Sequence, residues 1–316
     1  MLKYIIATYK KKEEQLQNLA SYYYDLLTKS SRKGALTTEK RKLRFIFRTI
    51  CYYPYSINLI RFVQHHKYLS EKVFTYMSLL NKIYRPYLCN MFGLSKKLSS
   101  VKENYQFIDK YFPEKIIPEF YEKGSIQLAE ITGTDEERFK IILSLYPNFD
   151  KEGDIDLKMV NSENIPLATI TFSFIKNEGK DTLFIGGIQG PYRTFDKDCI
   201  KKATKSMGGM FPKRILMEVI YKMCECFETN VEKMCVANDK HIYVTKKYLK
   251  RKKILANYDE FLETLNAEKL KSGLWKLPKE LFRKDISEIP SKKRSEYRKR
   301  YSILDSLAES IKENFV

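Results

Sequence analysis

The segment LATITFSFIKNEGKDTLFIGGIQG, residues 167–190, decides the fold class of this chain. Its two ends, 167–175 and 181–190, are short runs rich in Ile, Leu, Thr and Phe, a composition typical of β-strands. The link between them, at 176–181, is short and contains a glycine, as hairpin turns often do. We therefore expect two antiparallel strands joined by a tight turn.

Strand-like runs also precede this hairpin, and Gly, Asn or Pro separates most of them. They are SIQLAEIT at 125–132, FKIILSLYP at 139–147 and GDIDLKMV at 153–160. The elements expected after the hairpin are a helix at 212–229, a buried strand at 233–238, a helix at about 257–266, a strand at 273–278 and a helix from 291. The pattern predicts an antiparallel meander followed by alternating helices and strands.

The first 120 residues are predicted to be helical. The clearest pattern lies at 61–86, where apolar residues recur every three or four positions and predict one long helix. Further helices are expected at 11–29, 38–50 and 98–110. We thus predict an α+β chain in two parts. An N-terminal helical region, 1–120, packs on a mostly antiparallel mixed sheet with flanking helices, 121–316, which ends in a basic helix.

Composition bounds the function. With 43% apolar residues the 316-residue chain can bury a sizeable core, and no apolar run approaches the 18 residues of a membrane span. The scattered six cysteines form no disulfide framework, which favours a cytoplasmic protein, or one peripheral to the inner membrane face. The net charge of +19 is concentrated in the two ends of the chain, so we expect an anionic partner: a cofactor, RNA or an anionic lipid surface.

Two glycine pairs are candidate ligand sites. Gly186 and Gly187 end the second hairpin strand, where they either turn the chain or remove side chains beside a ligand or a second backbone. The second pair lies in KSMGGMFPK at 205–213, directly before the helix at 212–229. Backbone N–H groups at a helix start can hold a phosphate. The residues expected there are Lys205, Gly208, Gly209, Lys213 and Arg214.

His241 is the candidate catalytic residue, because it follows a buried strand whose rigid end can present an imidazole as a general base. Asn238 and Asp239 are expected to orient it. A surface loop histidine is the alternative. No metal is expected, because cysteines two apart on a helix, Cys224 and Cys226, point ~200° apart and cannot share a tetrahedral ion.

Two basic runs are candidate polyanion sites, with interleaved tyrosines that suit either base stacking or a lipid headgroup layer. The residues proposed for this contact are Lys246, Lys247, Lys250, Arg251, Lys252, Lys253, Lys292, Lys293 and Arg294. Lysines that only solvate helices would produce the same runs.

The chain resembles the VirK/YbjX family of bacterial proteins of unknown biochemistry. The segments that carry this resemblance include IYRPYL at 83–88, EGDIDL at 152–157, LFIGGIQGP at 183–191, ATKSMGGMFPK at 203–213, NDKHIY at 238–243 and IPSKKRSEYRKRY at 289–301. The chain departs from the family where it has GGMFPK and Leu262. The resemblance implies a role in virulence, in envelope changes and in resistance to cationic antimicrobial peptides. It implies no reaction.

The order of the elements also resembles an acetyltransferase-type (GNAT-like) core. There the loop that opens the helix holds the pyrophosphate of an acyl-coenzyme A, and the next strand splays away to admit the thioester arm. By this fold-level analogy, the expected function is an acyl- or aminoacyltransferase acting on an amine or hydroxyl of the envelope, a lipid or a peptide. The alternative is a non-enzymatic basic protein that binds RNA or an anionic membrane surface.

Overall fold

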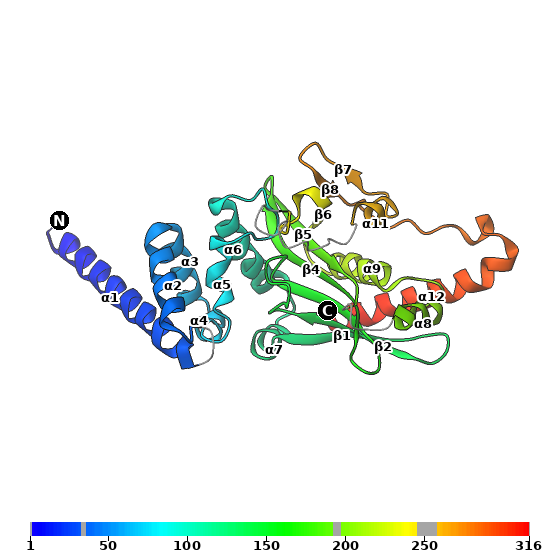
Figure 1. Cartoon of the computed structure of the whole chain (residues 1–316), viewed down its shortest axis with the longest axis horizontal. Helices are drawn as coiled ribbons and strands as arrows, with labels where there is room; N and C mark the ends of the chain where they lie inside the picture. The colour runs from blue at the N-terminus through cyan, green and yellow to red at the C-terminus, as the bar shows by residue number, and fades with distance from the viewer. Residues whose placement is uncertain (1, 33–35, 192–196, 245–257, 316) are drawn as a thin grey trace. The chain divides into compact units, whose positions relative to one another are not determined.

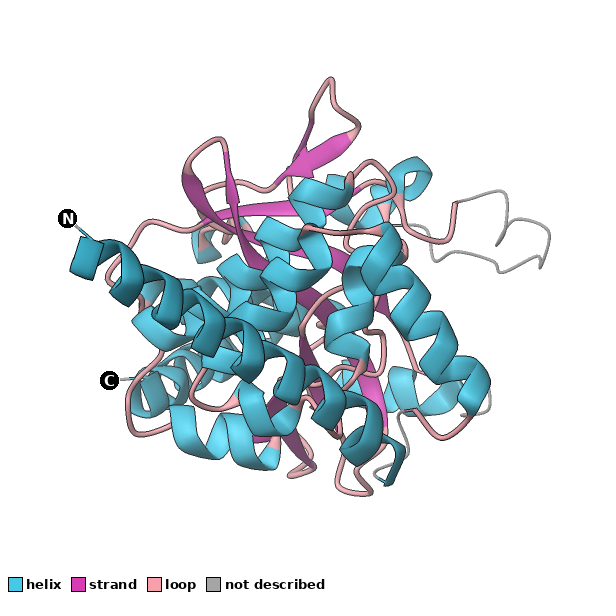
Figure 2. Cartoon of the chain, turned by 90° about the vertical axis from the view of Figure 1, so that its left-hand side faces the viewer, coloured by secondary structure: helices cyan, strands magenta, loops and turns pink. Residues whose placement is uncertain are grey.

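The computed structural model of the chain describes residues 2–32, 36–191, 197–244 and 258–315 (Figure 1). The chain divides into two compact units, which we call the N-terminal unit, Met1–Arg85, and the sheet unit, Pro86–Val316. The described residues form helices and one eight-stranded, mostly antiparallel sheet (Figure 2), so the predicted α+β class is confirmed.

The N-terminal unit is helical. Its described helices are α1 (Leu2–Arg32), α2 (Glu39–Cys51), α3 (Tyr55–His65), α4 (Leu69–Lys72) and α5 (Ser78–Asn81), and a 3-10 turn follows at Lys82–Tyr84. Its core contains Leu26 of α1, Phe45 of α2 and Val63 of α3, all buried. Phe45 also stacks on Tyr23, with ring centroids 5.6 Å apart.

The prediction of one continuous helix at 61–86 is wrong. The chain leaves the helical path at His66, whose ring nitrogen Nδ1 accepts hydrogen bonds from the backbone N–H groups of Tyr68 and Leu69, at 3.3 Å each. These bonds satisfy donors at the start of the next short helix, as a capping side chain does. The apolar residues of the pattern, such as Leu69 and Val73, are nevertheless buried. The periodicity therefore identified the buried side chains and missed the break.

The sheet unit contains all eight described strands. They are β1 (Ser125–Thr132), β2 (Arg138–Ser144), β3 (Ile155–Val160), β4 (Pro166–Asn177), β5 (Lys180–Gln189), β6 (Glu232–Val236), β7 (Glu268–Lys269) and β8 (Leu274–Lys276). Their order in the sheet is β1-β2-β3-β4-β5-β6-β8-β7. Only the β5–β6 pair is parallel. The predicted meander and the predicted β4–β5 hairpin are confirmed, and β7 was not predicted.

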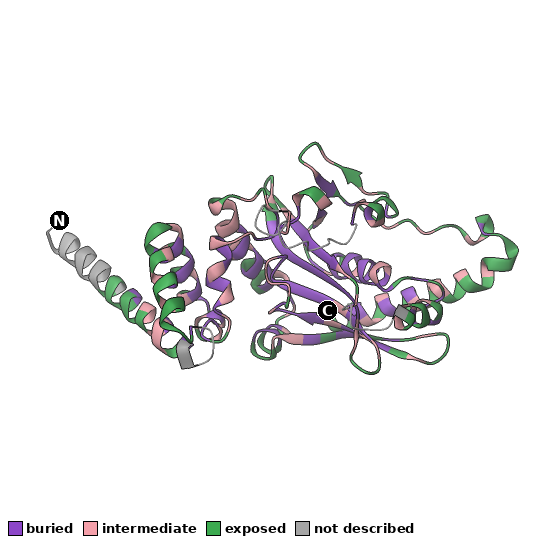
Figure 3. Cartoon of the chain, viewed as in Figure 1, coloured by how far each residue is buried: buried purple, intermediate pink, exposed green. Residues whose placement is uncertain are grey.

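The helices of the sheet unit are α6 (Leu94–Tyr111), α7 (Ile117–Lys123), α8 (Lys197–Ser206), α9 (Pro212–Glu225), α11 (Asp259–Glu263) and α12 (Ser291–Phe315). α6 belongs with the sheet because Phe107 stacks on Phe174 of β4, with centroids 3.9 Å apart. Phe227, just after α9, and Phe315 of α12 join the same aromatic cluster. The central strands are buried over most of their length (Figure 3). The aromatic cluster and the buried side chains of these strands form the core of the sheet unit.

Strands β5 and β6 part before β5 ends. They are paired only from Thr182–Glu232 to Ile185–Cys235. At that point the β4–β5 register shifts, so that Thr171 faces Gly187 and Phe172 faces Ile185, leaving Gly186 as an extra residue. The end of β5 therefore continues beside β4 alone, and the candidate site lies around this end.

Candidate functional site

The neighbour that the first glycine pair admits is Glu152. A Cβ atom on Gly186 would lie 2.0 Å from the backbone oxygen of Glu152, and one on Gly187 would lie 1.7 Å from its carboxylate Oε2. Any other residue at either position would collide with these atoms. The structure therefore shows that this glycine pair allows a second segment of the chain to approach closely. That segment carries the buried acid Glu152.

Glu152 is the centre of a buried polar cluster formed with Gln189, His241 and Tyr258, which we call the Glu152 cluster. The side-chain amide of Gln189 donates to both carboxylate oxygens of Glu152, at 3.1 and 3.2 Å, and to the hydroxyl of Tyr258, at 3.0 Å. The Nε2 atom of His241 lies 3.5 Å from Oε1 of Glu152. Glu152 and His241 are 0% and 1% exposed, so solvent does not screen this pair.

The backbone around His241 fixes its ring. The N–H of Tyr243 donates to Nδ1 at 3.3 Å, so Nδ1 carries no proton in this arrangement. A neutral imidazole then holds its proton on Nε2, which faces Glu152. Burial raises the pKa of Glu152, and the contacts with His241 and Gln189 oppose that rise. Nε2 lies 3.5 Å from this carboxylate and has no hydrogen-bond partner among the described residues, so the imidazole and the buried acid face each other without a hydrogen bond.

Neither residue expected to orient the His241 ring contacts that ring through its side chain, although the backbone oxygen of Asn238 accepts from the N–H of His241 at 3.4 Å. The side-chain oxygen of Asn238 accepts from the N–H of Tyr258 at 2.9 Å, and its own N–H donates to Asp259 at 3.1 Å. Asp239 is exposed and pairs with Lys240 at 3.1 Å. The carboxylate opposite the imidazole is that of Glu152. Sequence reasoning quoted EGDIDL only as a family motif and assigned no role to Glu152, Gln189 or Tyr258.

The other two acids of EGDIDL are buried with different partners. Asp154 accepts hydrogen bonds from the hydroxyls of Tyr105, at 3.1 Å, and Ser173, at 2.9 Å. Asp156 accepts from the hydroxyl of Thr171 at 2.6 Å and lies 3.4 Å from the ammonium of Lys158. Their bonds tie the strands together, whereas only Glu152 faces an imidazole.

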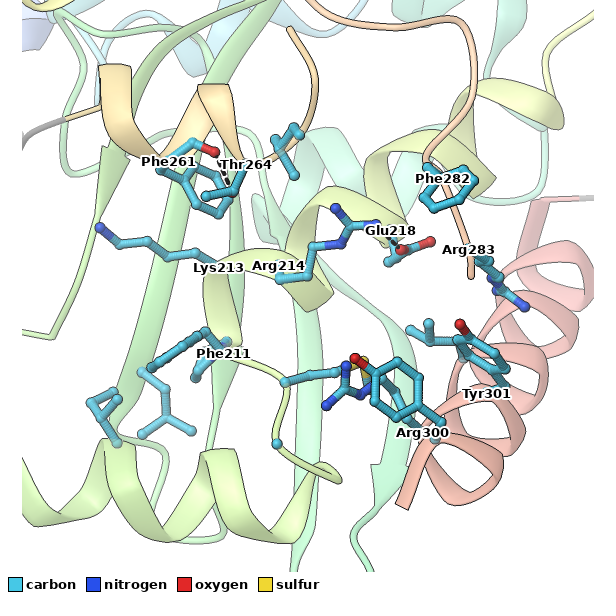
Figure 4. A pocket seen from close by; sticks show the side chains of 18 of the residues that line it. Phe211, Lys213, Arg214, Glu218, Phe261, Thr264, Phe282, Arg283, Arg300 and Tyr301 are labelled. Atoms are coloured by element: carbon cyan, nitrogen blue, oxygen red, sulfur yellow. Dashed lines mark hydrogen bonds and ion pairs between the residues drawn. The ribbon is translucent and has the colours of Figure 1, made fainter. Parts of the chain in front are cut away.

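A cavity of 780 Å³ lies at the start of α9; the four residues of the Glu152 cluster are not among those that line it, but two of their sequence neighbours are. Gly190 directly follows Gln189, and Glu260 is two residues from Tyr258. Figure 4 shows Phe261 and Thr264 on one side of this space and Arg300 and Tyr301 on the other. The charged lining residues are five cations and two acids: Lys213, Arg214, Arg283, Lys284, Arg300, Glu218 and Glu260. Large apolar side chains, including Phe211 and Phe282, complete the wall.

Two cations of the cavity, Lys213 and Lys284, form no ion pair within the described chain, and of these two Lys213 is half-buried and Lys284 is exposed. Arg214 pairs with Glu218 at 2.8 Å, Arg283 pairs with Asp305 at 2.6 Å, and the guanidinium of Arg300 donates to the backbone oxygen of Gly208 at 2.8 and 3.0 Å. Lys213 is half-buried, and within the part of the chain that the structure describes it forms no ion pair. Burial lowers the pKa of Lys213. An anion bound in the cavity would offset this desolvated charge.

The second glycine pair ends α8. The N–H of Gly208 donates to Lys205, and that of Gly209 to Thr204, at 3.1 and 2.8 Å, with left-handed φ values of +62° and +80°. Their N–H groups thus cap a helix. Of the residues predicted to seat a phosphate, Gly209, Lys213 and Arg214 line the cavity, whereas Lys205 is exposed. The groups that face the cavity are therefore its cations, and not the amides of this loop.

The proposed polyanion residues are only partly described. Lys246, Lys247, Lys250, Arg251, Lys252 and Lys253 lie outside the described residues. Lys292 and Lys293 are exposed at the start of α12. The guanidinium of Arg294 donates to the backbone oxygens of Ile289 and Ser287, at 2.8 and 3.0 Å, so it fastens the turn before α12.

Among the described residues, no group of three or more His, Cys, Asp or Glu side chains is placed to hold a metal ion. None of the described helices combines the length and the apolar character needed to cross a bilayer.

Comparison with known proteins finds relatives whose names state no activity. The family model described as "Protein of unknown function (DUF535)" matches residues 35–313. The chain is 32% identical over 265 residues to "Uncharacterized protein YbjX" of Escherichia coli (strain K12), covering 84% of this chain and 80% of that protein. Two proteins of Haemophilus influenzae, each named "Uncharacterized protein", are 28% identical. Those matches cover 74% and 80% of this chain and 76% and 82% of the relatives.

Proposed function

The chain belongs to the DUF535 family, which corresponds to the VirK/YbjX family indicated by its sequence motifs. We propose that it is an acyltransferase that uses a phosphorylated acyl donor such as an acyl-coenzyme A. The observation that carries this proposal is the cationic cavity at the start of α9, where Lys213 holds a half-buried charge. The acceptor is an amine or hydroxyl of an envelope component, a lipid or a peptide.

The strand order supports the proposal by analogy. In an acetyltransferase-type core, the strand after the helix pairs with the preceding strand in parallel and then splays away, which opens a space for the thioester arm. Here β6 follows α9 and is parallel to β5; their pairing stops at Ile185–Cys235, one residue before β6 ends, while β5 continues to Gln189. The antiparallel strands β8 and β7 then extend the sheet beyond β6. This is a likeness of fold, and the argument for function rests on the side chains.

The cavity fits the donor in size and character. Its 780 Å³ falls within the roughly 300–1,000 Å³ typical of small-molecule sites. We place the phosphates at the start of α9. Lys213 and Arg214 lie in its first turn, and Arg300 donates to the backbone oxygen of Gly208 in the preceding loop. The apolar wall, with Phe211 and Phe261, suits an acyl chain and its arm.

The Glu152 cluster supplies the proton acceptor. A bound donor supplies an activated acyl carbonyl. The nitrogen or oxygen of the acceptor forms a bond to the carbonyl carbon, the bond from that carbon to the donor's sulfur breaks, and the released proton goes to the carboxylate of Glu152. Because the pKa of Glu152 is raised by burial, its carboxylate is a stronger base than an exposed one. The ring of His241 positions this carboxylate, since its Nδ1 is occupied by the N–H of Tyr243.

Calorimetric titration of the full chain with coenzyme A and acetyl-coenzyme A tests the donor site. We expect binding, and a loss of about tenfold or more in affinity in Lys213→Gln, because a hydrogen bond to a charged group contributes about 1.5–3 kcal/mol. Lys205→Gln removes an exposed cation of the same segment and is the matched control. Absence of binding by the unaltered chain at millimolar ligand, or an equal loss in Lys205→Gln, would refute the site.

Turnover of acetyl-coenzyme A with small amine and hydroxyl acceptors tests the chemistry separately. Glu152→Gln should leave donor affinity unchanged and slow transfer by ~10²-fold or more, the usual scale for loss of a general base. His241→Ala should slow transfer as well. A Glu152→Gln chain with undiminished turnover would remove Glu152 from the reaction.

A further inference from the structure

The outer face of α2 exposes large apolar side chains at helical spacing. Leu43, Phe47 and Ile50, at i, i+4 and i+7, are 65%, 67% and 71% exposed, and Tyr53, just beyond the helix, is 70% exposed. We call these four residues the α2 apolar strip. Ten large hydrophobic side chains are exposed in the described part of the chain, and the segment 43–53 holds five of them. The strip is therefore a concentrated patch.

The opposite face of α2 explains why the strip points outward. Phe45 is buried against Tyr23, and the hydroxyl of Thr49 donates to the backbone oxygen of Phe45 at 3.0 Å. A helix that already buries one face in its own unit has no need of a second apolar face for folding. The strip is thus available for a partner.

Cations lie beside the strip on the same helix. Lys40, Arg41 and Arg44 are exposed, and their positions continue the helical surface on one flank of Leu43 and Phe47. Lys40 and Arg44 form no ion pair with any residue that the structure describes. The N-terminal unit as a whole has 17 Lys and Arg against 5 Asp and Glu, a net charge of +12.

We propose that α2 docks the protein on an anionic lipid bilayer, with the α2 apolar strip inserted at the headgroup–acyl boundary and the basic flank on the lipid phosphates. A helix with an apolar strip of Leu, Ile and Phe beside Lys and Arg is the chemistry of interfacial membrane helices. A second copy of the chain is a poorer occupant, because two units of charge +12 repel each other. RNA would use the cations and gain nothing from exposed Leu43 and Ile50.

Flotation of the full chain with vesicles tests this surface, in buffer without any acyl donor, so the result is independent of the proposed catalysis. We expect binding to vesicles of phosphatidylglycerol and phosphatidylethanolamine, and little binding to pure phosphatidylcholine. The triple variant Leu43→Ser, Phe47→Ser, Ile50→Ser should lose at least tenfold in vesicle affinity. Because these side chains are exposed, its thermal unfolding should match that of the unaltered chain.

Two further variants separate the strip from its surroundings. Met91→Ser removes an exposed side chain of the sheet unit, 44%, that lies outside the cavity, and should bind vesicles unchanged. The variant Lys40→Gln, Arg41→Gln, Arg44→Gln should bind anionic vesicles more weakly and with less dependence on salt. The proposal fails if the unaltered chain ignores anionic vesicles at low salt, or if the triple serine variant still binds them fully. It also fails if a dimer becomes monomeric in that variant, or if single-stranded RNA is bound and vesicles are not.

Discussion

The two glycine pairs of the sheet unit are alike in sequence and differ in what surrounds them. Gly186 and Gly187 lie against the backbone and the buried carboxylate of Glu152. Gly208 and Gly209 have left-handed φ values, and a Cβ atom on Gly209 would meet the exposed side chain of Glu296 and the half-buried side chain of Arg300. The first pair is required by space, and the second by backbone conformation. A dense polar cluster adjoins one, and a cavity with a half-buried lysine adjoins the other.

The sharpest way to break this comparison is Gly187→Ala. The new methyl group would lie 1.7 Å from Oε2 of Glu152, so the carboxylate must move and give up its bonds to Gln189. We expect a loss of about 3 kcal/mol in the free energy of unfolding, the upper range for overpacking a core. Chemical denaturation measures it.

Two companion variants show whether space is the cause. Gly190→Ala adds a methyl group where no atom lies within 4 Å, so it should cost far less. Glu152→Ala clears the space beside Gly187, so Gly187→Ala should be much less damaging in that background. Equal costs in the two backgrounds would mean that the carboxylate is not what requires a glycine.

Sequence patterns predicted some elements of the fold and missed others. The five strands of the meander could be predicted, because each is a short apolar run between turn residues. The single helix at 61–86 could not be corrected from the pattern, because a capping bond from His66 breaks it. α8 was missed because its sequence, KDCIKKATKS, is short and contains few apolar residues, although these lie on one face of the helix. Local patterns reveal burial better than they reveal breaks.

A second, smaller effect is expected from the titration of Glu152. Its folded-state pKa is raised by burial, so the folded chain binds its proton more tightly than the unfolded chain. The stabilisation that this provides is complete below the ordinary Glu pKa, about 4.5, and is lost as the pH rises through the folded-state pKa. Each unit of elevation corresponds to about 1.4 kcal/mol.

Glu152→Gln keeps the size of the side chain and removes this titration. Unfolding free energies measured across the acid range should therefore decline less with rising pH in Glu152→Gln than in the unaltered chain. Asp156, whose pKa burial also raises, contributes the same trend to both chains and cancels in the difference. Parallel pH profiles would show that Glu152 has the same pKa folded and unfolded.

Gly209→Ala completes the comparison of the glycine pairs with a smaller expected cost, about 1 kcal/mol, from the φ of +80° that an L-residue rarely adopts. The methyl group would lie 2.5 Å from Oε1 of Glu296, a side chain that can swing into solvent. Thermal unfolding beside Gly187→Ala gives the ratio directly. If Gly209→Ala proved the more damaging, then the packing of α12 on this loop would be tighter than the glycine geometry implies.

The candidate site was less predictable than the fold, because part of it is formed by residues that only folding brings together. Lys213, Arg214 and Gly209, which line the cavity, could be singled out from the sequence because charge and glycine next to a helix start are local signals. Glu152 and Tyr258 could not be linked to His241, because these contacts form only in the folded chain and no local sequence pattern signals them. Asp239 was chosen as the partner by proximity in sequence, whereas the buried acid came from the segment before β3.

The smallest expected effect concerns Lys213, and its sign is the informative part. Lys213→Met replaces a half-buried ammonium that pairs with no described acid by an apolar side chain of similar length. Removing the desolvation cost should leave stability equal or raise it by under ~1 kcal/mol, while binding of coenzyme A falls. Lys205→Met, at an exposed position, should change neither quantity. A stabilised chain with weakened ligand binding is what a site held ready for an anion predicts, whereas a destabilised Lys213→Met would mean that the ammonium serves the fold.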